Sequence, residues 1–183
     1  MKAPSKLLLN VASLACLLLA VRAPAQPLSA IDKNTTIATL HAEGAQIYEC
    51  KLDTSKPAGQ ARALTWQFRE PIATLMVGGQ SVGRHYAGPS WDLVDGGAVK
   101  GRVVMSTPAP TANDIPWLEL EVIDHRNKGI LSDAVTVLRI NTKGWLAQGS
   151  CESEGKYLSI PYAADYLFLR RSDCCCNRDC PKL

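Results

Sequence analysis

The stretch Leu64-Thr65-Trp66-Gln67-Phe68-Arg69 alternates apolar and polar side chains at every position. A second stretch, Leu118-Glu119-Leu120-Glu121-Val122, shows the same alternation. Successive side chains of a β-strand point to opposite faces, so a period of two predicts strands with one buried face. No segment shows a helical stripe longer than about two turns, and residues 37–42 are ambiguous between strand and helix. The fold is therefore expected to be all-β.

Six further runs are rich in strand-forming residues and are bounded by Gly, Pro, Asn or Asp; they are residues 45–52, 72–77, 82–86, 99–106, 134–140 and 162–169. Val77-Gly78-Gly79-Gln80 and Val94-Asp95-Gly96-Gly97 are typical hairpin turns. The proline-rich residues 106–116 are expected to form an ordered surface loop. About eight short strands at these spacings predict a single-domain antiparallel β-sandwich or a partly closed barrel.

The N-terminus is typical of a cleavable secretory signal. Lys2 and Lys6 precede an apolar run over residues 7–21, and Ala23-Pro24-Ala25 forms an A-x-A cleavage site. The run is shorter than the roughly 20 residues of a membrane-spanning helix. Lipidation at Cys16 is disfavoured because the apolar run continues past it. We expect a secreted or periplasmic protein without stable membrane insertion.

The predicted parts of the chain are a signal peptide (1–25), a single β-rich domain (26–171) and a cysteine-rich, disordered tail (172–183). The whole chain has 20 Lys and Arg against 17 Asp and Glu, but Lys2, Lys6 and Arg22 belong to the signal. Its removal leaves 17 of each sign (20 − 3 against 17). Binding to nucleic acid or to an anionic membrane relies on clustered positive charge, so neither partner is expected.

Six cysteines remain after signal cleavage, and an oxidising compartment favours disulfides between them. Cys50 and Cys151 each stand alone in strand-like sequence, which makes them the favoured pair. The others, Cys174, Cys175, Cys176 and Cys180, crowd the tail. Metal binding, local or intermolecular disulfides and a tail without a selected role all remain open for them, although three consecutive cysteines are a poor tetrahedral scaffold.

Five blocks together resemble, in order, the domain-of-unknown-function family 3455 (DUF3455), whose members are secreted bacterial and fungal proteins. They are GAQIYEC (44–50), GRHYAGPSW (83–91), PAP (108–110) with IPWL (115–118), RINTKG (139–144) and IPYAADY (160–166). The resemblance spans about residues 36–170. It implies one domain without an established activity, and it supports the pairing of Cys50 with Cys151. The cysteine-rich tail lies beyond the family's pattern.

Residues Gly79-Gln80-Ser81-Val82-Gly83 match G-x-S-x-G, and Asp92 or Asp114 and then His125 follow in the chain order of a hydrolase triad. That motif needs a strand-to-helix turn. Gly88-Pro89 arrives too soon for a helix, so a hairpin turn is the better interpretation.

Residues 85–92 gather a histidine, aromatic rings and a carboxylate, which are the ingredients of a small-molecule or sugar-binding patch. The alternative is that the rings pair across a hairpin or fill the core. The candidate ligand-binding residues are His85, Tyr86, Trp91, Asp92 and Trp117. The spacing of His41, His85 and His125 matches no metal motif, so neither a metal site nor a cofactor is expected.

The leading hypothesis is a non-catalytic exported domain that binds a small molecule, a glycan or a component of the cell envelope. One alternative is a small secreted hydrolase that uses His85 or His125 with a nearby acid. Another is a structural or interaction protein of the cell envelope, which would expose a large apolar patch. Whether the chain catalyses a reaction, and its oligomeric state, are left open.

Overall fold

The computed structural model describes residues 35–55, 57 and 61–171. These residues form eight strands and no α-helix: β1 (Thr36–Leu52), β2 (Leu64–Val77), β3 (Gln80–Tyr86), β4 (Ser90–Leu93), β5 (Ala98–Thr107), β6 (Trp117–Arg126), β7 (Thr136–Lys143) and β8 (Tyr157–Leu169). The all-β expectation is confirmed. The predicted signal peptide, its cleavage site, Cys16 and the four tail cysteines lie outside the described residues.

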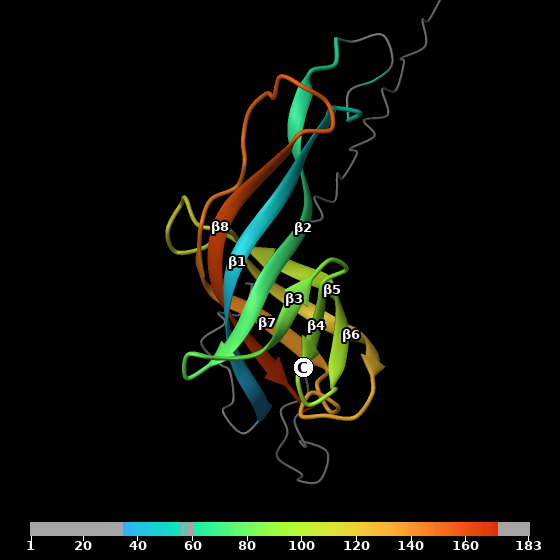
Figure 1. Ribbon diagram of the computed structural model, residues 1–183, viewed down its shortest axis with the longest axis vertical. Coiled ribbons are helices and arrows are strands. Elements are labelled where there is room, and N and C mark those ends of the chain that lie inside the picture. Colours follow the sequence, from blue (N-terminus) through green and yellow to red (C-terminus); the bar gives the residue numbers. More distant parts are fainter. Residues whose placement is uncertain (1–34, 56, 58–60, 172–183) are drawn as a thin grey trace, which may run out of the picture. The chain divides into compact units, whose positions relative to one another are not determined.

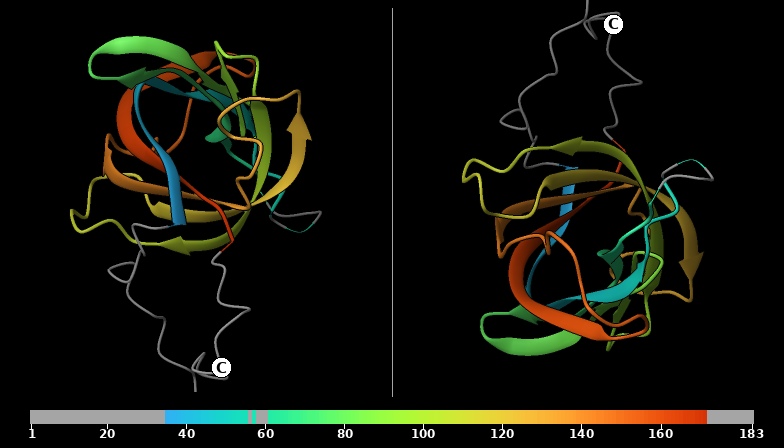
Figure 2. Two further views of the ribbon diagram at one scale, coloured as in Figure 1. Left: turned by 90° about the horizontal axis from the view of Figure 1, so that it is seen from below. Right: turned by 90° about the horizontal axis from the view of Figure 1, so that it is seen from above.

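Each strand pairs with the next along the chain, and β8 pairs back with β1, so the sheet closes into an irregular antiparallel barrel (Figures 1 and 2). Of the two predicted architectures the barrel is therefore the one observed. Both expected hairpin turns are present. Gly78 and Gly79, which join β2 to β3, have φ of 57° and 79°, as a two-residue type I′ turn requires. Gly96, with φ of 90°, turns between β4 and β5.

Strands β1, β2 and β8 are longer than expected and extend beyond the other strands (Figure 1). Pro71 and Pro161 lack the N–H that a ladder needs, and they mark where the extension begins. Strand β2 pairs with β3 only from Ala73 onward, and the pairing of β8 with β7 ends at Ala163. We call residues 45–52, 64–71 and 157–161 the arm.

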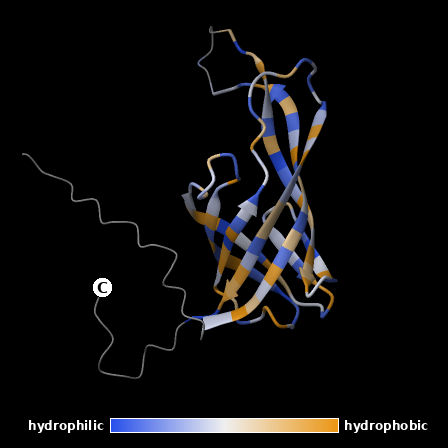
Figure 3. Cartoon of the chain, turned by 90° about the vertical axis from the view of Figure 1, so that its left-hand side faces the viewer, coloured by the Kyte–Doolittle hydropathy of each residue, from blue (hydrophilic) through white to orange (hydrophobic). Residues whose placement is uncertain are grey.

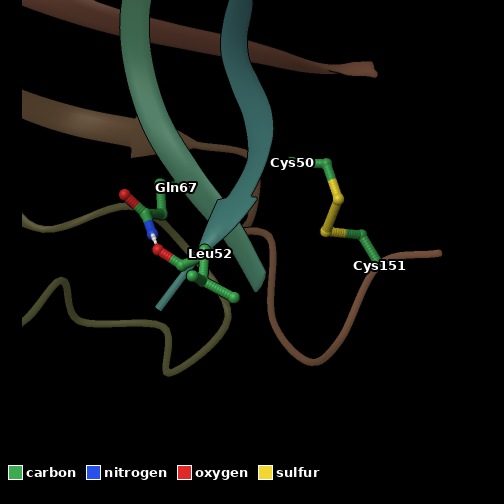
Figure 4. The surroundings of a disulfide bond; sticks show 4 residues. All are labelled: Cys50, Leu52, Gln67 and Cys151. Atoms are coloured by element: carbon green, nitrogen blue, oxygen red, sulfur yellow. Dashed lines mark hydrogen bonds between the residues drawn. A yellow bond between two sulfur atoms is a disulfide. The ribbon is translucent and has the colours of Figure 1, made fainter. Parts of the chain in front are cut away.

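The arm carries the disulfide between Cys50 and Cys151, whose Cα atoms are 5.9 Å apart (Figure 4). The predicted pairing is confirmed. Backbone hydrogen bonds from Cys50 N to Lys156 O (2.8 Å) and from Cys151 N to Leu64 O (3.0 Å) tie the following loop to the arm. Nearby, Gln67 Nε2 donates to the carbonyl of Leu52 at 3.1 Å. The disulfide joins two cysteines that are 101 positions apart in the sequence.

The barrel interior is filled by every second residue of its strands, and hydrophobic and hydrophilic residues alternate along them (Figure 3). The core includes Leu40, Leu75, Trp91, Val137 and Phe168, all at most 3% exposed. The ambiguous residues 37–42 belong to β1, and the runs 64–69 and 72–77 form one strand. Strand β4 is implied by the expected hairpin turn at 94–97 but was not among the predicted runs, because its four residues are too few to show a period. No helix of the length and apolarity needed to cross a membrane occurs among the described residues.

Candidate ligand-binding site

A cluster of aromatic rings occupies the middle of the barrel. His85 of β3 and Trp91 of β4 are cross-strand partners, and their rings stack with centroids 4.7 Å apart. Tyr166 of β8 lies 4.8 Å from His85 and 5.3 Å from Trp91, and Phe168 meets Trp91 edge-on at 5.7 Å. All four side chains are at most 3% exposed. The rings of residues distant in sequence therefore meet because the barrel closes.

The large indole of Trp91 fits because β5 has a glycine beside it. A Cβ at Gly101 would lie 3.1 Å from the Trp91 ring and 3.3 Å from the side chain of Leu120. Such contacts are tighter than those that real Cβ atoms normally make. The glycine thus fixes the depth at which the ring sits.

His85 is a neutral acceptor in this cluster. Its Nδ1 lies 2.9 Å from the carbonyl oxygen of Ser90, and because a carbonyl accepts, Nδ1 carries the proton. Burial lowers the pKa of His85 to about 4, even though the bond to Ser90 acts to raise it. The ring is therefore uncharged at neutral pH, and its Nε2 offers a lone pair.

A cavity of about 140 Å³ lies against this cluster, at the end of the β3–β4 hairpin. Its aromatic floor consists of His85, Trp91 and Tyr166. The remaining lining residues come from β2, β5, β6, β7 and the β3–β4 turn, and are Phe68, Arg69, Pro71, Gly88, Pro89, Val103, Leu118, Leu120 and Arg139. We call this space the Arg139 cavity.

Two residues that line the Arg139 cavity carry buried donors that make no close hydrogen bond among the described residues. These donors are the hydroxyl of Tyr166, which is 1% exposed, and Nε1 of Trp91, which is fully buried. Burial raises the pKa of Tyr166, so its hydroxyl keeps its proton, although the neighbouring Arg139 and Tyr162 side chains act to lower that pKa. A buried polar group without a partner typically costs about 1–3 kcal/mol. Four more side-chain atoms make no close hydrogen bond among the described residues, the last of them beside Tyr166: Gln46 Nε2, Tyr48 OH, Trp117 Nε1 and Tyr162 OH.

Arg139 brings a positive charge to the same cavity. It stands opposite Tyr166 in the β7–β8 ladder and opposite Leu118 in the β6–β7 ladder, so all three side chains share the inner face. Its Nε and Nη2 donate to the carbonyl of Pro116 at 3.2 and 2.9 Å. Within the described chain, no carboxylate lies within ion-pair distance of this guanidinium. The second arginine, Arg69, is paired with Glu70 at 3.0 Å.

The loop that holds Arg139 is itself firmly attached. Ile115 N donates to Gly144 O at 2.7 Å, and the buried Thr142 hydroxyl donates to Ile115 O. Asp114 accepts from Gly144 N at 3.1 Å. The expected proline-rich loop is thus ordered, and its anchoring fixes the Pro116 carbonyl that orients the guanidinium.

The five predicted ligand residues do not form one site. His85 and Trp91 line the Arg139 cavity, whereas Tyr86 and Asp92 lie on the outer face. There the Asp92 carboxylate accepts from the Tyr86 hydroxyl (2.9 Å), Arg84 (3.0 Å) and Arg126 (2.8 Å). Burial acts to raise the pKa of Asp92, but the bonds from Arg84 and Tyr86 outweigh it and hold the pKa below its usual value. Trp117 is half-buried and does not line the cavity.

The histidines do not converge. His125 Nε2 lies 2.8 Å from the Ala134 carbonyl, and His41 Nδ1 lies 2.7 Å from Asp165 on the outside of the barrel. A hydrolase would need a histidine paired with an acid. His85 and His125 each contact a backbone carbonyl instead, and the histidine paired with a carboxylate is His41, which was not predicted for that role. No group of three or more His, Cys, Asp or Glu suited to a metal occurs in the described ranges. Residues 79–83, the G-x-S-x-G match, form a hairpin turn and its following strand, as expected.

A second cavity, of about 380 Å³, lies at the opposite ends of β3 and β4 and is almost entirely apolar. Its lining includes Ile37, Leu40, Val82 and Leu93, with Asp95 at its edge. Unlike the Arg139 cavity, it contains none of the buried polar atoms that lack a partner. Its polar lining residues are Thr39 and Asp95, and both carboxylate oxygens of Asp95 already accept backbone hydrogen bonds, from Gly97 N and Ile130 N.

The sequence interpretation missed Arg139 and Tyr166. Arg139 interrupts the strand-like run 134–140. A charged residue at an inward position of a strand is the signal that could have identified it. Its inward direction depends on strand register, which the run alone does not reveal.

Fold and site together define the class of protein: a disulfide-bonded, eight-stranded antiparallel β-barrel with a small, partly open cavity lined by arginine. The chain belongs to the family DUF3455, described as a protein of unknown function, whose sequence pattern matches residues 76–170. The match begins at the end of β2 and thus leaves out β1 and most of the arm, which the resemblance over residues 36–170 had included. No curated protein and no solved structure matches the chain.

Proposed function

We propose that this protein is a small-molecule-binding domain and that the Arg139 cavity is its binding site. The observation that carries the proposal is the Arg139 guanidinium, which lines the cavity without a carboxylate partner among the described residues, beside the indole of Trp91, whose buried Nε1 makes no hydrogen bond there. Buried polar groups are normally satisfied, and exceptions call for an explanation such as a ligand. A ligand that accepts hydrogen bonds would recover what their burial costs.

The size and lining of the cavity support a small molecule over a glycan. An apolar cavity of roughly 150 Å³ is large enough for a benzene ring, and the Arg139 cavity measures about 140 Å³. Ligand sites combine mostly apolar walls with a few polar groups that fix orientation. Here Phe68, Pro71 and Leu118 provide such walls, and Arg139 provides the orienting group.

The test compares two valines of β5. Val103 is 47% exposed and lines the cavity, whereas Val104 is 52% exposed and does not. Phenylalanine suits a strand, so Val103→Phe should fill the cavity without unfolding the barrel, and Val104→Phe is the matched control. Calorimetric titration with a panel of single-ring compounds should detect binding to the wild type and to Val104→Phe, with at least tenfold weaker binding to Val103→Phe. Equal affinities for the two variants, or no binding by any ring, would refute the proposal.

We also propose that the domain, residues 26–171, acts outside the cytoplasm after cleavage behind Ala25. The Cys50–Cys151 disulfide supports this location, since such bonds persist in oxidising compartments. N-terminal sequencing of the exported protein should begin at Gln26. Recovery of the uncut chain with a free Cys50 thiol from the cytoplasm alone would contradict it.

A further inference from the structure

The hydrogen-bonding groups of the Arg139 cavity differ in kind, and their balance constrains the ligand. Arg139, Tyr166 and Trp91 present donors: the guanidinium and indole N–H groups cannot accept at all. His85, which also lines the cavity, has its proton on Nδ1 and so carries an acceptor at Nε2. A complementary ligand therefore carries several acceptors at one end and a single donor elsewhere.

Resting on the proposed function, we propose that the ligand of the Arg139 cavity is a single-ring aromatic carboxylic acid that also carries a hydroxyl group. In this arrangement the carboxylate meets Arg139 and Tyr166, the ring lies against the aromatic floor and apolar walls, and the hydroxyl donates to His85 Nε2.

The carboxylate follows from the geometry of Arg139. The Pro116 carbonyl occupies the guanidinium edge formed by Nε and Nη2. The guanidinium has a second edge, between Nη1 and Nη2, and Tyr166 lies close enough to Arg139 to act on it. The two parallel N–H groups of such an edge match the two oxygens of a carboxylate. An anion there would neutralise a charge that no carboxylate of the described chain compensates, and Tyr166, opposite Arg139 in the ladder, would add a third donor.

The ring follows from the shape of the site. The cavity volume of about 140 Å³ suits about one six-membered ring with small substituents. Phe68, His85, Trp91 and Tyr166 all line it, and aromatic rings favour edge-on or offset contacts with one another. Pro71 and Leu120 complete the apolar walls.

The hydroxyl follows from His85. A ligand without a donor would bury the His85 acceptor unpaired, and sites built around a hydrogen bond discriminate strongly against analogues that lack it. An unsubstituted benzoate should therefore bind more weakly than the best of the three hydroxybenzoate isomers. Because the bond joins two neutral groups, we expect a difference of about 3- to 10-fold.

The test titrates the mature disulfide-bonded protein with four probe types at pH 7.5: the three hydroxybenzoates, benzoate, benzamide and phenol. We expect the best hydroxybenzoate to bind most tightly and benzamide and phenol to bind about 10- to 100-fold more weakly, because each lacks the carboxylate. Arg139→Met should remove the preference for acid over amide. Arg102→Met removes the same charge from the outer surface, where Arg102 pairs with Glu121 at 2.7 Å, and should keep that preference.

Arg139→Lys keeps the positive charge but loses the paired N–H groups of the guanidinium, and it replaces Arg139→Met if that variant does not fold. This variant should bind the acid at least fivefold more weakly than the wild type. His85→Phe should make benzoate and hydroxybenzoate equal. If phenol or benzamide binds wild type as tightly as the acids while Val103→Phe still blocks binding, the ligand class is wrong and the site stands. If no ring binds, the site itself is refuted.

Discussion

Protonation of His85 is expected to destabilise the barrel as the pH falls. The pKa of His85 drops from 6.5 to about 4 on folding, because the charged ring would be buried between Trp91 and Tyr166. Between these values the unfolded chain binds the proton and the folded chain does not, so stability rises with pH. The contribution is complete above about pH 7.5 and is lost as the pH falls through 6.5 toward 4. The shift corresponds to about 2 kcal/mol lost by pH 5 and about 3 kcal/mol in total.

The assay is urea denaturation of the disulfide-bonded protein at pH 7.5, 6 and 5. His85→Phe keeps a ring against Trp91 but cannot titrate, and it should be less stable at pH 7.5 because the Ser90 carbonyl loses its donor. Its loss of stability between pH 7.5 and 5 should be about 2 kcal/mol smaller than that of the wild type. Identical losses in the two proteins would show that His85 titrates normally and that the interior is more hydrated than the burial of the ring implies.

Three further predictions concern the disulfide, a close contact between β1 and β2, and the outer face. Reduction of the Cys50–Cys151 bond, which spans 101 positions, should lower stability by up to about 4–5 kcal/mol in thermal unfolding with and without reductant; an unchanged midpoint would contradict it. Gly44→Ala should destabilise the barrel by at least about 1–3 kcal/mol, because its Cβ would lie 2.0 Å from Ile72 O and 2.8 Å from Ala73 Cβ; a wild-type midpoint would show that β1 can move. The hydrogen bond to Asp165 raises the pKa of His41, so that pair stabilises below pH 6.5 and less above it. His41→Gln should cost more at pH 5.5 than at pH 8.5, and the reverse order would exclude the pair.

The strands and turns could largely be predicted from the sequence, because period-two alternation and Gly-Gly turns are local signals. The alternation over residues 64–69 and both glycine turns correspond to observed elements. The length of β2 could not be predicted, because Pro71 looked like an interruption of the strand. Pro71 in fact lies inside β2, where the strand has no partner in β3. Choosing a barrel over a sandwich required the pairing of β1 with β8, a contact between the two ends of the described chain.

The site was only half predictable for the same reason. His85 and Trp91 were recognised because they lie six residues apart on one hairpin. Arg139 and Tyr166 join them only through the register of β7 on β8, and a slip of one residue would turn both outward. The alternation that brings His85 inward also sends its neighbour Tyr86 outward, which is why the local cluster divides between two faces.

The most direct test of ligand binding in the Arg139 cavity follows the indole N–H of Trp91 by NMR. Trp91 lines the cavity, and its Nε1 has no hydrogen-bond partner among the described residues. Titration with the tightest-binding hydroxybenzoate should shift its resonance in a saturable manner in the wild type and in Val104→Phe, but not in Val103→Phe. A Trp91 resonance that stays in place while the compound binds, or that moves equally in both variants, would contradict the assignment of the cavity as the binding site.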